Sequence, residues 1–420
     1  MFESIIDWLA YSFNFAVSNP LILVLLILQI PNYFFMIWSF FIILLGLPRK
    51  KRVYPDTDER NSFAVIICAK NEEGAIAGLL NAIEGQDYPK DKYHVYLLLD
   101  HCTDRTKEIA SAYPFVTCLE RTGDTPPGKG QLLKWGFEKL LARRDFDHNA
   151  FMFFDADNIP IPTFMKEMNK RLAAGDDIIQ GNRKAGKPFR TAVTSWYAIY
   201  WVFQNYIFQY SREKRGFNCQ LTGTGLVLRR NVVEDGGFET TAITEDMEFS
   251  HQRVLKGNRI HYSIDAVVYD EQPSDLRTMY FQLRRWCSGV FQVLPQYVGK
   301  YRKVIGKKPS VLLFDFFMLF LSSVFGAIAT VCGIISTIYS VILVPEALFF
   351  TLLTALLTFP LAWLLELVFL KAAGVKGTAN GFFTFPIFMV ILGFCTVISA
   401  FKHDIAWKRI EHKGVKAENG

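Results

Sequence analysis

Two aspartates follow an apolar run in the segment Ala150 to Pro160, which reads AFMFFDADNIP. The run has the composition of a buried strand, and the proline prevents the strand from continuing. Side chains at positions i and i+2 of an extended segment point to the same side. Asp155 and Asp157 can therefore face one hard divalent cation that also carries phosphate oxygens. Alone, an Asp-x-Asp pair is more often an ordinary loop or capping feature, so its meaning depends on the elements around it.

These aspartates lie in a stretch, from Val53 to about Pro273, with the composition of a soluble α/β domain. Apolar runs of strand length alternate there with helical patterns, which predicts a mostly parallel sheet with helices on its faces. The expected strands are Phe63 to Cys68, His94 to Asp100, Phe115 to Leu119 and Ala150 to Asp155, and the expected helices are Gly74 to Gly85, Thr103 to Tyr113 and Lys129 to Arg143. Such sheets bind ligands at the carboxyl ends of their strands, where Asp100 and Asp155 both fall.

The composition of the whole chain indicates a membrane protein, because 51% of its 420 residues are hydrophobic and 38 are phenylalanine. Leu21 to Leu47 is an uncharged apolar run of about 27 residues, long enough to cross a bilayer. It lacks the basic leader, the short core and the cleavage site of a signal peptide. The basic run Pro48 to Arg52 follows it, so the positive-inside rule predicts an outside N-terminus and a cytoplasmic α/β domain.

Further spans are expected at about Leu312 to Val344, Leu348 to Leu370 and Phe382 to Phe401. Three such spans would place the lysine-rich tail outside, against the positive-inside rule, so either one segment is re-entrant or the tail is an exception. Glu366 is an ionisable side chain within an expected span. It either marks a pathway or snorkels to the membrane surface.

Two segments, Phe189 to Tyr210 and Met279 to Arg302, interleave aromatic residues with polar and basic ones. Both are predicted to be helices in the membrane interface, and the alternative is a helix packed only on its own domain. The expected organisation is a span in 1–52, an α/β domain in 53–275 with an interface helix near 189–211, interface helices in 276–310, and further spans with a basic tail in 311–420.

The charged residues and the cysteines limit the possible partners. The net charge is +6, and the basic residues form short clusters beside apolar segments, which favours anionic lipid over nucleic acid. The seven cysteines show no metal-ligand spacing, so we expect reduced thiols.

Four motifs occur in order along the α/β domain and the segment that follows it. They are Asp100 at a strand end, Asp155-x-Asp157, Thr244-Glu245-Asp246 and Gln282-x-x-Arg285-Trp286. This ordered set resembles the membrane-bound, processive family 2 glycosyltransferases, which include hyaluronan, chitin, cellulose and poly-N-acetylglucosamine synthases. The resemblance covers roughly residues 60 to 290 with the flanking spans, and it implies a cytoplasmic domain of the GT-A type.

The resemblance implies a cofactor, Mg²⁺ or Mn²⁺, that neutralises the leaving diphosphate. Asp157 would hold it, and Asp155 would either share the ion or contact the ribose. Asp246, with Glu245 beside it, matches the general base that deprotonates the acceptor hydroxyl, and one base opposite the leaving group gives inversion to a β-linkage. The ordinary alternative is that Thr244 caps a helix whose positive end favours both carboxylates.

The remaining site residues are also assigned by resemblance. Gln282, Arg285 and Trp286 would hold the diphosphate and stack the acceptor sugar, for which a guanidinium and an indole are suited, whereas an aromatic belt at the interface is the alternative. Nucleotide-binding roles are implied for Asn71, Glu72, Asp100 and Lys129, and an acceptor-side role for Gly223, Thr224 and Gly225. The alternative for Lys129 is a solvated lysine at the start of a helix. The alternative for the loop Gly223 to Gly225 is an ordinary tight turn. His101 and Cys102 depart from the family, which often has a second acidic residue there.

The expected function is an inverting transferase that builds a β-linked polysaccharide from UDP-N-acetylglucosamine or UDP-glucose and passes it through its own spans in the cell membrane. Its expected partners are the UDP-sugar, the growing polysaccharide and membrane lipid, with no nucleic acid. One alternative is a non-processive transferase that glycosylates a lipid, similar to ceramide glucosyltransferase. An alternative of another class is a transporter or channel with a regulatory cytoplasmic domain, against which the order of the acidic motifs argues.

Overall fold

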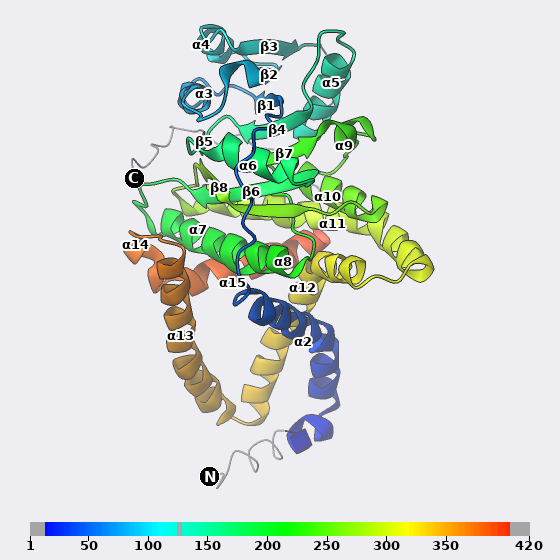
Figure 1. The fold of residues 1–420 in the computed structure, drawn as a ribbon. Helices are drawn as coiled ribbons and strands as arrows, with labels where there is room; N and C mark the ends of the chain where they lie inside the picture. Colours follow the sequence, from blue (N-terminus) through cyan, green and yellow to red (C-terminus); the bar gives the residue numbers. More distant parts are fainter. Residues whose placement is uncertain (1–12, 124–125, 127, 404–420) are drawn as a thin grey trace.

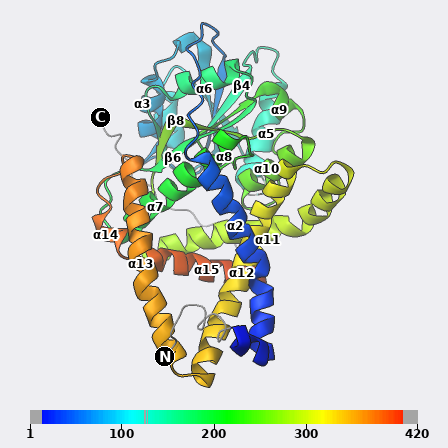
Figure 2. The same ribbon diagram turned by 60° about the horizontal axis from the view of Figure 1, so that its bottom comes forward.

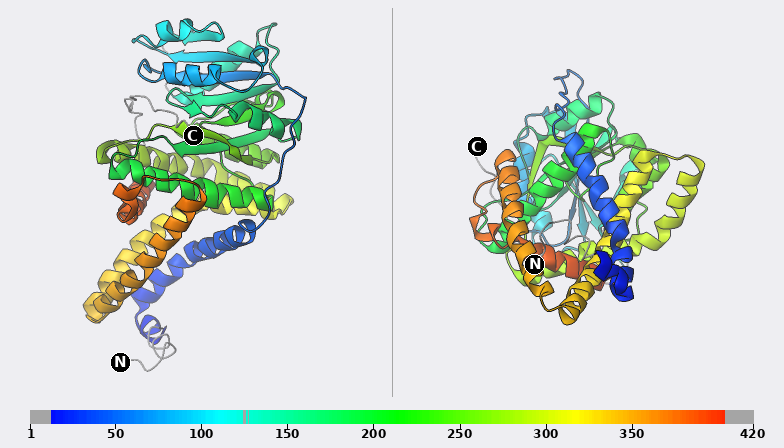
Figure 3. Two further views of the ribbon diagram at one scale, coloured as in Figure 1. Left: turned by 60° about the vertical axis from the view of Figure 1, so that its left-hand side comes forward. Right: turned by 90° about the horizontal axis from the view of Figure 1, so that it is seen from below.

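The computed structural model describes residues 13–123, 126 and 128–403. A domain built around one sheet rests on a layer of helices, and three long apolar helices extend from the other side of that layer (Figures 1 and 2). The side view in Figure 3 shows the sheet domain, the helical layer and the apolar helices one after another.

The sheet has eight strands in the order β3-β2-β1-β4-β7-β6-β8-β5. The strands are β1 Phe63–Ala69, β2 Tyr93–Asp100, β3 Val116–Arg121, β4 Ala150–Asp155, β5 Ile159–Pro160, β6 Ile178–Ala185, β7 Leu226–Arg229 and β8 His261–Asp270. Four of the seven pairings are parallel and three, β4 with β7, β6 with β7 and β5 with β8, are antiparallel. The predicted α/β class is confirmed, and β1 to β4 match the four predicted strands.

The central strands are buried on both faces, which explains their continuous apolar runs. In β1, Ala64 and Ile66 belong to one hydrophobic core, and Phe63, Val65 and Ile67 belong to another on the opposite face. The helices beside the sheet are α3 Ile76–Glu84, α4 Thr106–Ser111, α5 Lys129–Leu141, α6 Phe164–Ala173, α9 Arg230–Glu234 and α10 Glu245–Lys256, with a 3₁₀ turn η1 at Lys90–Lys92. Three of them occupy the predicted helical segments.

The helical layer under the sheet contains the two segments expected at the membrane interface. Its helices are α7 Ala192–Val202, the π-helix η2 Phe203–Gln209, α8 Tyr210–Arg215, α11 Leu276–Lys307, α14 Ala379–Phe382 and α15 Phe385–Phe401. Helix α7 is buried on nearly all sides, as is typical of an apolar helix inside a protein. Its ring contacts include Trp196 with Phe388 at 6.3 Å, so these aromatic side chains pack within the protein.

Among the residues that the structure describes, three helices are long and apolar enough to cross a membrane: α2 Pro20–Gly46, α12 Val311–Leu343 and α13 Ala347–Ala372. The segment expected as a fourth span forms α15, a helix of 17 residues. At 1.5 Å per residue it is about 26 Å long, shorter than a hydrocarbon core of about 30 Å. It packs on α11 and α12 and runs across the direction of α13 in Figure 2, so it differs from the expected span.

A buried carboxylate joins two of the apolar helices to the layer above them. Asp315 on α12 accepts a hydrogen bond from Trp38 Nε1 on α2 at 2.8 Å and pairs with Arg212 on α8. Both charged side chains are buried, so each is the neutralising partner of the other. This contact fixes α2 and α12 beneath the sheet domain.

Candidate active site

A cavity of about 440 Å³ opens at the carboxyl ends of β1, β2 and β4, above the helical layer. Most of the predicted site residues line it, although they come from distant parts of the chain. They are Glu72, Asp100, Lys129, Asp155, Asp157, Gly223, Glu245, Asp246, Gln282, Arg285 and Trp286. The fold therefore brings all four sequence motifs to one place.

Lys129, at the first position of α5, lies at the centre of the acidic groups. Its Nζ is 2.5 Å from Asp155 Oδ1 and 3.7 Å from Glu245 Oε1, and it donates a hydrogen bond to the Gly223 carbonyl at 2.8 Å. Burial disfavours the charged form of Lys129, but the negative charges of Asp155 and Glu245 have the larger combined effect and raise its pKa. Burial likewise opposes ionisation of Asp155, yet Lys129 keeps the pKa of that carboxyl low. Lys129 is thus a partly buried cation that is paired within the site and not a fully solvated lysine.

Asp157 lies close to two other carboxyl groups, those of Asp155 and Asp270. Burial, and then the charges of Asp270 and Asp155, raise the pKa of Asp157 well above its usual range. The Asn158 amide is 3.2 Å from Asp157 Oδ1 and 3.3 Å from Asp270 Oδ1, so it donates toward both carboxyl groups. Crowded carboxylate oxygens are the donor set of a hard divalent cation, whose charge would relieve this repulsion. The residues present therefore fit the predicted ion.

Glu245 and Asp246 occupy the first turn of α10, where the backbone N–H of Met247 donates to Asp246 Oδ1 at 2.8 Å. Burial is the main reason that the pKa of Glu245 is raised to about 7 and that the pKa of Asp246 is also raised. Thr244 stands at the N-cap position, but its hydroxyl caps no backbone N–H and is buried with no hydrogen-bond partner among the described residues. The simple capping explanation therefore does not account for this motif.

The side chains of α11 close the cavity on the side of the helical layer. Trp286 lies 6.1 Å from Tyr200, with the rings stacked, and 6.0 Å from Trp201, with the rings at 68° to each other. Aromatic faces of this kind suit the CH-rich face of a pyranose. In addition, Gln282 Oε1 and Thr222 Oγ1 are buried without a partner among the described residues, as polar atoms awaiting a ligand would be.

Asp100 lines the cavity at the end of β2 and has several cationic neighbours. Arg121 Nη2 is 2.7 Å and His101 Nδ1 is 2.8 Å from Asp100 Oδ1, and Lys70 Nζ is 3.8 Å from Oδ2. Burial opposes ionisation, but the hydrogen bonds from Arg121 and His101 keep the pKa of Asp100 low. His101, which replaces the acidic residue expected there, thus supports the carboxylate before it and also bonds to the Gly123 carbonyl at 2.7 Å.

Three predicted site residues, Asn71, Thr224 and Gly225, are not among those that line the cavity. Asn71 accepts a hydrogen bond from the Thr103 backbone N–H at 2.7 Å and shapes its own loop, with φ of 59°. Thr224 is fully buried, and its hydroxyl accepts from the Asp155 backbone N–H at 3.0 Å. Gly225 has φ of 59° and packs on Val268. These contacts let the three residues position the loops around the cavity, and their predicted roles toward substrate stay predictions.

Sequence reasoning missed several lining residues, among them Arg183, Tyr200 and Trp201. Arg183 on β6 donates to Asp270 Oδ2 at 2.6 Å and to the Thr222 carbonyl at 2.8 Å, and its guanidinium lies 4.6 Å from the Trp201 ring centre. No motif marks Arg183, because its role arises only when β6 pairs with β8. The two aromatic residues belong to the segment Phe189 to Tyr210, whose composition alone favours contact with the membrane interface.

Helix α11 also packs against the turn that contains Thr244, Glu245 and Asp246, which gives a test. A Cβ atom at Gly289 would collide with the Thr244 side chain, whereas Gly299 on the same helix has open space around it. Gly289→Ala should therefore displace the Thr244-Glu245-Asp246 turn and destabilise the fold by about 1–3 kcal/mol. Nucleotide release should fall at least tenfold in Gly289→Ala and stay unchanged in Gly299→Ala. Equal activity in the two variants would contradict this packing.

Comparison with known proteins identifies the family of the chain. The profile of the family described as "Glycosyltransferase like family 2" matches residues 60–289. The chain is similar to "Probable glycosyltransferase YdaM" of Bacillus subtilis, at 25% identity over 63% of this chain and 64% of the relative. It is also similar to "Beta-monoglucosyldiacylglycerol synthase" of Nostoc, at 24% over 54% and 49%, and to "Glucomannan 4-beta-mannosyltransferase 1" of Oryza sativa, at 25% over 66% and 54%. The chain thus spans about half to two thirds of the length of these relatives.

A solved structure supports the fold. The mannosyltransferase PcManGT of Pyrobaculum calidifontis, determined with GDP-Man and Mn²⁺, aligns with a TM-score of 0.58 at 19% identity over 84% of this chain and 99% of that one. The family profile covers more than half of the chain and contains the whole constellation of acidic side chains, so the transporter alternative lacks support. The chain belongs to the family 2 glycosyltransferases, and its catalytic domain has the GT-A type of fold.

Proposed function

We propose that this enzyme transfers a hexose from a nucleotide sugar to an acceptor hydroxyl with inversion, and so forms a β-linkage. The observation that supports this most is the single cavity lined by Asp155, Asp157, Asp246, Arg285 and Trp286. One end of that cavity is acidic and lies at the strand ends. The other end is aromatic and lies on the helical layer, as an acceptor site would require.

In the proposed reaction the diphosphate of the donor binds beside Lys129 and Arg285, whose positive charges attract the negatively charged phosphates. Asp157, with Asp155, would hold Mg²⁺ or Mn²⁺, which supplies Lewis-acid neutralisation of the leaving diphosphate when it is bound. Asp246 accepts the proton of the acceptor hydroxyl as that oxygen bonds to the anomeric carbon. Bond formation on the face opposite the diphosphate turns an α-linked donor into a β-linked product.

The raised pKa values in the first turn of α10 predict how activity depends on pH. Asp246 acts as a base only when deprotonated, and burial raises its pKa above the usual range of an aspartate, so it takes up its proton at a higher pH than a solvated aspartate does. The kcat/KM for nucleotide release should therefore decrease about tenfold per pH unit below the raised pKa of Asp246. In Glu245→Gln one neighbouring charge is lost, and the acidic limb should move to lower pH. If the acidic limb of the pH profile is at the same pH in Glu245→Gln as in wild type, the charges of Glu245 and Asp246 are not coupled.

A growing polysaccharide is the first candidate for the acceptor. The donor is proposed to be UDP-N-acetylglucosamine or UDP-glucose. The stack of Trp286 on Tyr200 offers sugar rings a platform at the acceptor end. The similarity to glucomannan 4-beta-mannosyltransferase agrees with a β-linked polysaccharide. That similarity, and the GDP-Man bound by the solved neighbour, make GDP-mannose a donor worth testing.

A lipid acceptor is the second candidate, favoured by the arrangement of the apolar helices. Helix α13 has no buried residue in its most apolar window, and it diverges from α12 toward the sheet domain in Figures 1 and 2. A polar polymer needs an enclosed path across a bilayer, whereas a lipid enters from the side. The similarity to beta-monoglucosyldiacylglycerol synthase points the same way.

We further propose that α2, α12 and α13 span the cell membrane with the catalytic domain in the cytoplasm. The basic run after α2 is then on the cytoplasmic side. After the catalytic domain the chain then crosses the membrane twice, through α12 and α13, and not three times. The end of α13 is therefore on the same side of the membrane as the catalytic domain. The lysine-rich tail that conflicted with the positive-inside rule would then be cytoplasmic as well.

The test is a donor screen with the purified enzyme in lipid vesicles, Mn²⁺ or Mg²⁺, and radiolabelled UDP-N-acetylglucosamine, UDP-glucose or GDP-mannose. We expect metal-dependent nucleoside diphosphate release with one of these donors. A product that stays at the origin of a thin-layer plate indicates a polymer, and one that migrates as a glycolipid indicates the lipid candidate. No release with any donor would contradict the proposed activity.

A further inference from the structure

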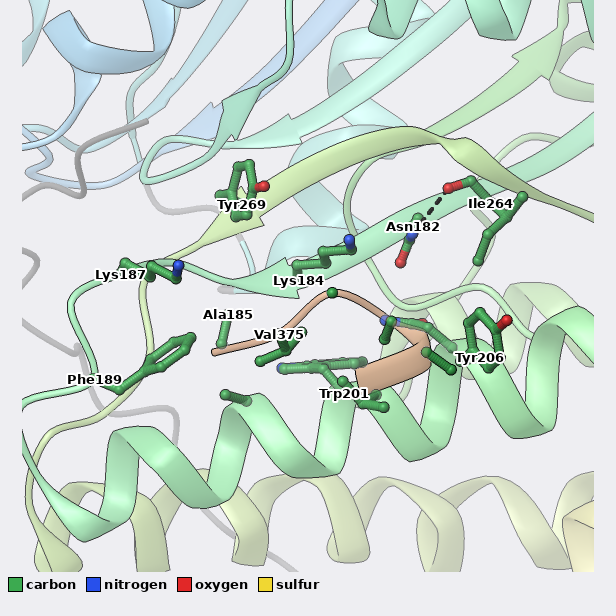
Figure 4. Close-up of a pocket in the computed structure, with 16 residues that line it drawn as sticks. Asn182, Lys184, Ala185, Lys187, Phe189, Trp201, Tyr206, Ile264, Tyr269 and Val375 are labelled. Atoms are coloured by element: carbon green, nitrogen blue, oxygen red, sulfur yellow. Dashed lines mark hydrogen bonds between the residues drawn. The ribbon is translucent and has the colours of Figure 1, made fainter. Parts of the chain in front are cut away.

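Two groups of basic side chains differ in whether their charges are already paired. Figure 4 shows a slot of about 240 Å³ between strand β6 and helix α7, with Lys184 and Lys187 in its lining. Both lysines already interact with other groups of the protein, so this slot offers no free charge to a ligand. The second group, which we call the basic end of α11, consists of Arg302, Lys303, Lys307 and Lys308. All four side chains are exposed, and no ion pair joins them to any acidic residue that the structure describes.

The basic end of α11 lies beside the part of α12 that enters the proposed membrane. Helix α12 has 33 residues, which at 1.5 Å per residue gives about 50 Å, about 20 Å more than a hydrocarbon core requires. Its first turns account for the extra length, because Leu313, Phe316 and Phe320 belong to the hydrophobic core under the sheet. The ring of Tyr301 on α11 stacks on Phe317 at 4.8 Å. With α12 as a span, the residues that follow Tyr301 lie at the depth of the lipid headgroups.

This end of α11 is open on the side of the apolar helices. The view from below in Figure 3 shows it projecting beside α2 and α12, and neither helix covers it there or in Figure 2. Lys303 and Lys307 are four residues apart, so they share one face of the helix, roughly opposite the buried Tyr301. The helix dipole explains cations in the last turn only, and Arg302 and Lys303 precede that turn. Clusters of four or more basic residues next to the cytoplasmic end of a span attract anionic lipid.

Helix α11 connects its basic end to the catalytic cavity. The first half of the helix lines that cavity, and the second half holds α10 in place. The Tyr297 hydroxyl donates to Glu248 Oε1 at 3.3 Å, and the Tyr301 hydroxyl is 2.7 Å from His251 Nδ1. Both partners belong to α10, whose first turn carries Asp246. The position of the proposed base is therefore linked to the residues directly before the basic end of α11.

We propose that the basic end of α11 docks on the headgroups of anionic phospholipids and that this contact favours the active arrangement of the catalytic cavity. The proposal rests on the proposed span α12. A membrane surface that holds the basic end of α11 also holds Tyr297 and Tyr301, and through them α10. Anionic lipid thus raises activity without contact with the substrate.

The binding test uses the full-length protein in lipid nanodiscs and measures, by mass spectrometry, how fast a water-soluble acylating reagent modifies each lysine. Phosphatidylglycerol mixed into phosphatidylcholine should slow the modification of Lys303 and Lys307 on the order of tenfold, because the headgroups then cover both amines. High salt should remove this difference. Lys134 and Lys139 are internal controls, since both are exposed on α5, which lies away from the apolar helices in Figure 1. Their rates should be the same with either lipid composition.

Three outcomes of this test would overturn the proposal. An unchanged rate at Lys303 and Lys307 would reject the docking surface. Equal protection by phosphatidylcholine alone would reject the preference for anionic lipid, and protection by inorganic phosphate in detergent without lipid would indicate a site for a free anion. The measurement needs neither a variant nor a donor sugar, so its failure is distinct from failure of the proposed reaction.

The link to activity is tested by nucleotide release in vesicles of increasing phosphatidylglycerol content. Release should rise several-fold in wild type and in the control Lys134→Gln with Lys139→Gln. Lys303→Gln with Lys307→Gln removes two charges from the basic end of α11 and should lose this rise. An equal rise in that variant would contradict the link between the basic end of α11 and the cavity.

Discussion

Replacing Asp246 by asparagine is expected to reduce sugar transfer by about 10² to 10⁴-fold, which is the usual contribution of a positioned general base. Asparagine keeps the size of the side chain and can still accept the hydrogen bond from the Met247 backbone N–H. It cannot take a proton from the acceptor hydroxyl. Binding of the nucleoside diphosphate, which is assigned to other residues of the cavity, should therefore remain, as isothermal titration with UDP or GDP would show.

The matched control for this variant is Asp145→Asn, because Asp145 is an exposed carboxylate that pairs with Arg143 on the surface. It should transfer sugar at the wild-type rate. Polymer or glycolipid synthesis by Asp246→Asn within tenfold of wild type would reject the base assignment. Loss of nucleotide binding together with activity would instead indicate a collapsed site.

Replacing Asp157 by asparagine should have opposite effects on activity and on metal-free stability. The variant loses a proposed metal ligand, so activity at saturating donor should decrease on the order of 10²- to 10³-fold. Asp157 is also a buried carboxyl close to the charges of Asp270 and Asp155, so removing it relieves repulsion. The melting temperature without metal should stay the same or rise, whereas the stabilisation that Mn²⁺ with nucleotide gives to wild type should be lost.

Asp265→Asn on the same strand as Asp270 serves as the control, since Asp265 is partly exposed and pairs with Lys51. It should keep both its activity and its response to Mn²⁺. A lower metal-free melting temperature in Asp157→Asn, with an intact response to Mn²⁺, would indicate that Asp157 is only structural.

The parts of the fold that the sequence predicts correctly are those whose local pattern has one explanation. Strands β1 to β4 are buried in the sheet, so each appears as a short apolar run of strand length. Asp100 and Asp155 end β2 and β4, which flank β1 and run parallel to it, so their carboxyl ends lie at one edge of the sheet. The position of both residues at that edge therefore follows from the strand pattern. The ordered motifs then predict that Asp246 and Arg285 reach the same edge.

The parts that the sequence does not predict depend on which partner covers an apolar surface. Helix α7 has the composition of an interface helix, but strand β6 and helix α15 cover it in place of lipid. The segment Phe385–Phe401 is as apolar as a span, yet it packs across α11 and α12. Arg183 and Asp270 join the site through pairing of β6 with β8, for which no local pattern exists.

The central claim is inverting sugar transfer in the cavity that contains Asp246, and the anomeric configuration of the product tests it most directly. The purified enzyme is incubated with an α-linked nucleotide sugar labelled at the anomeric carbon, and the new bond is assigned by NMR coupling and by digestion with specific glycosidases. We predict a β-linkage that a β-glycosidase releases and an α-glycosidase does not. An α-linked product would contradict a single displacement with Asp246 as base.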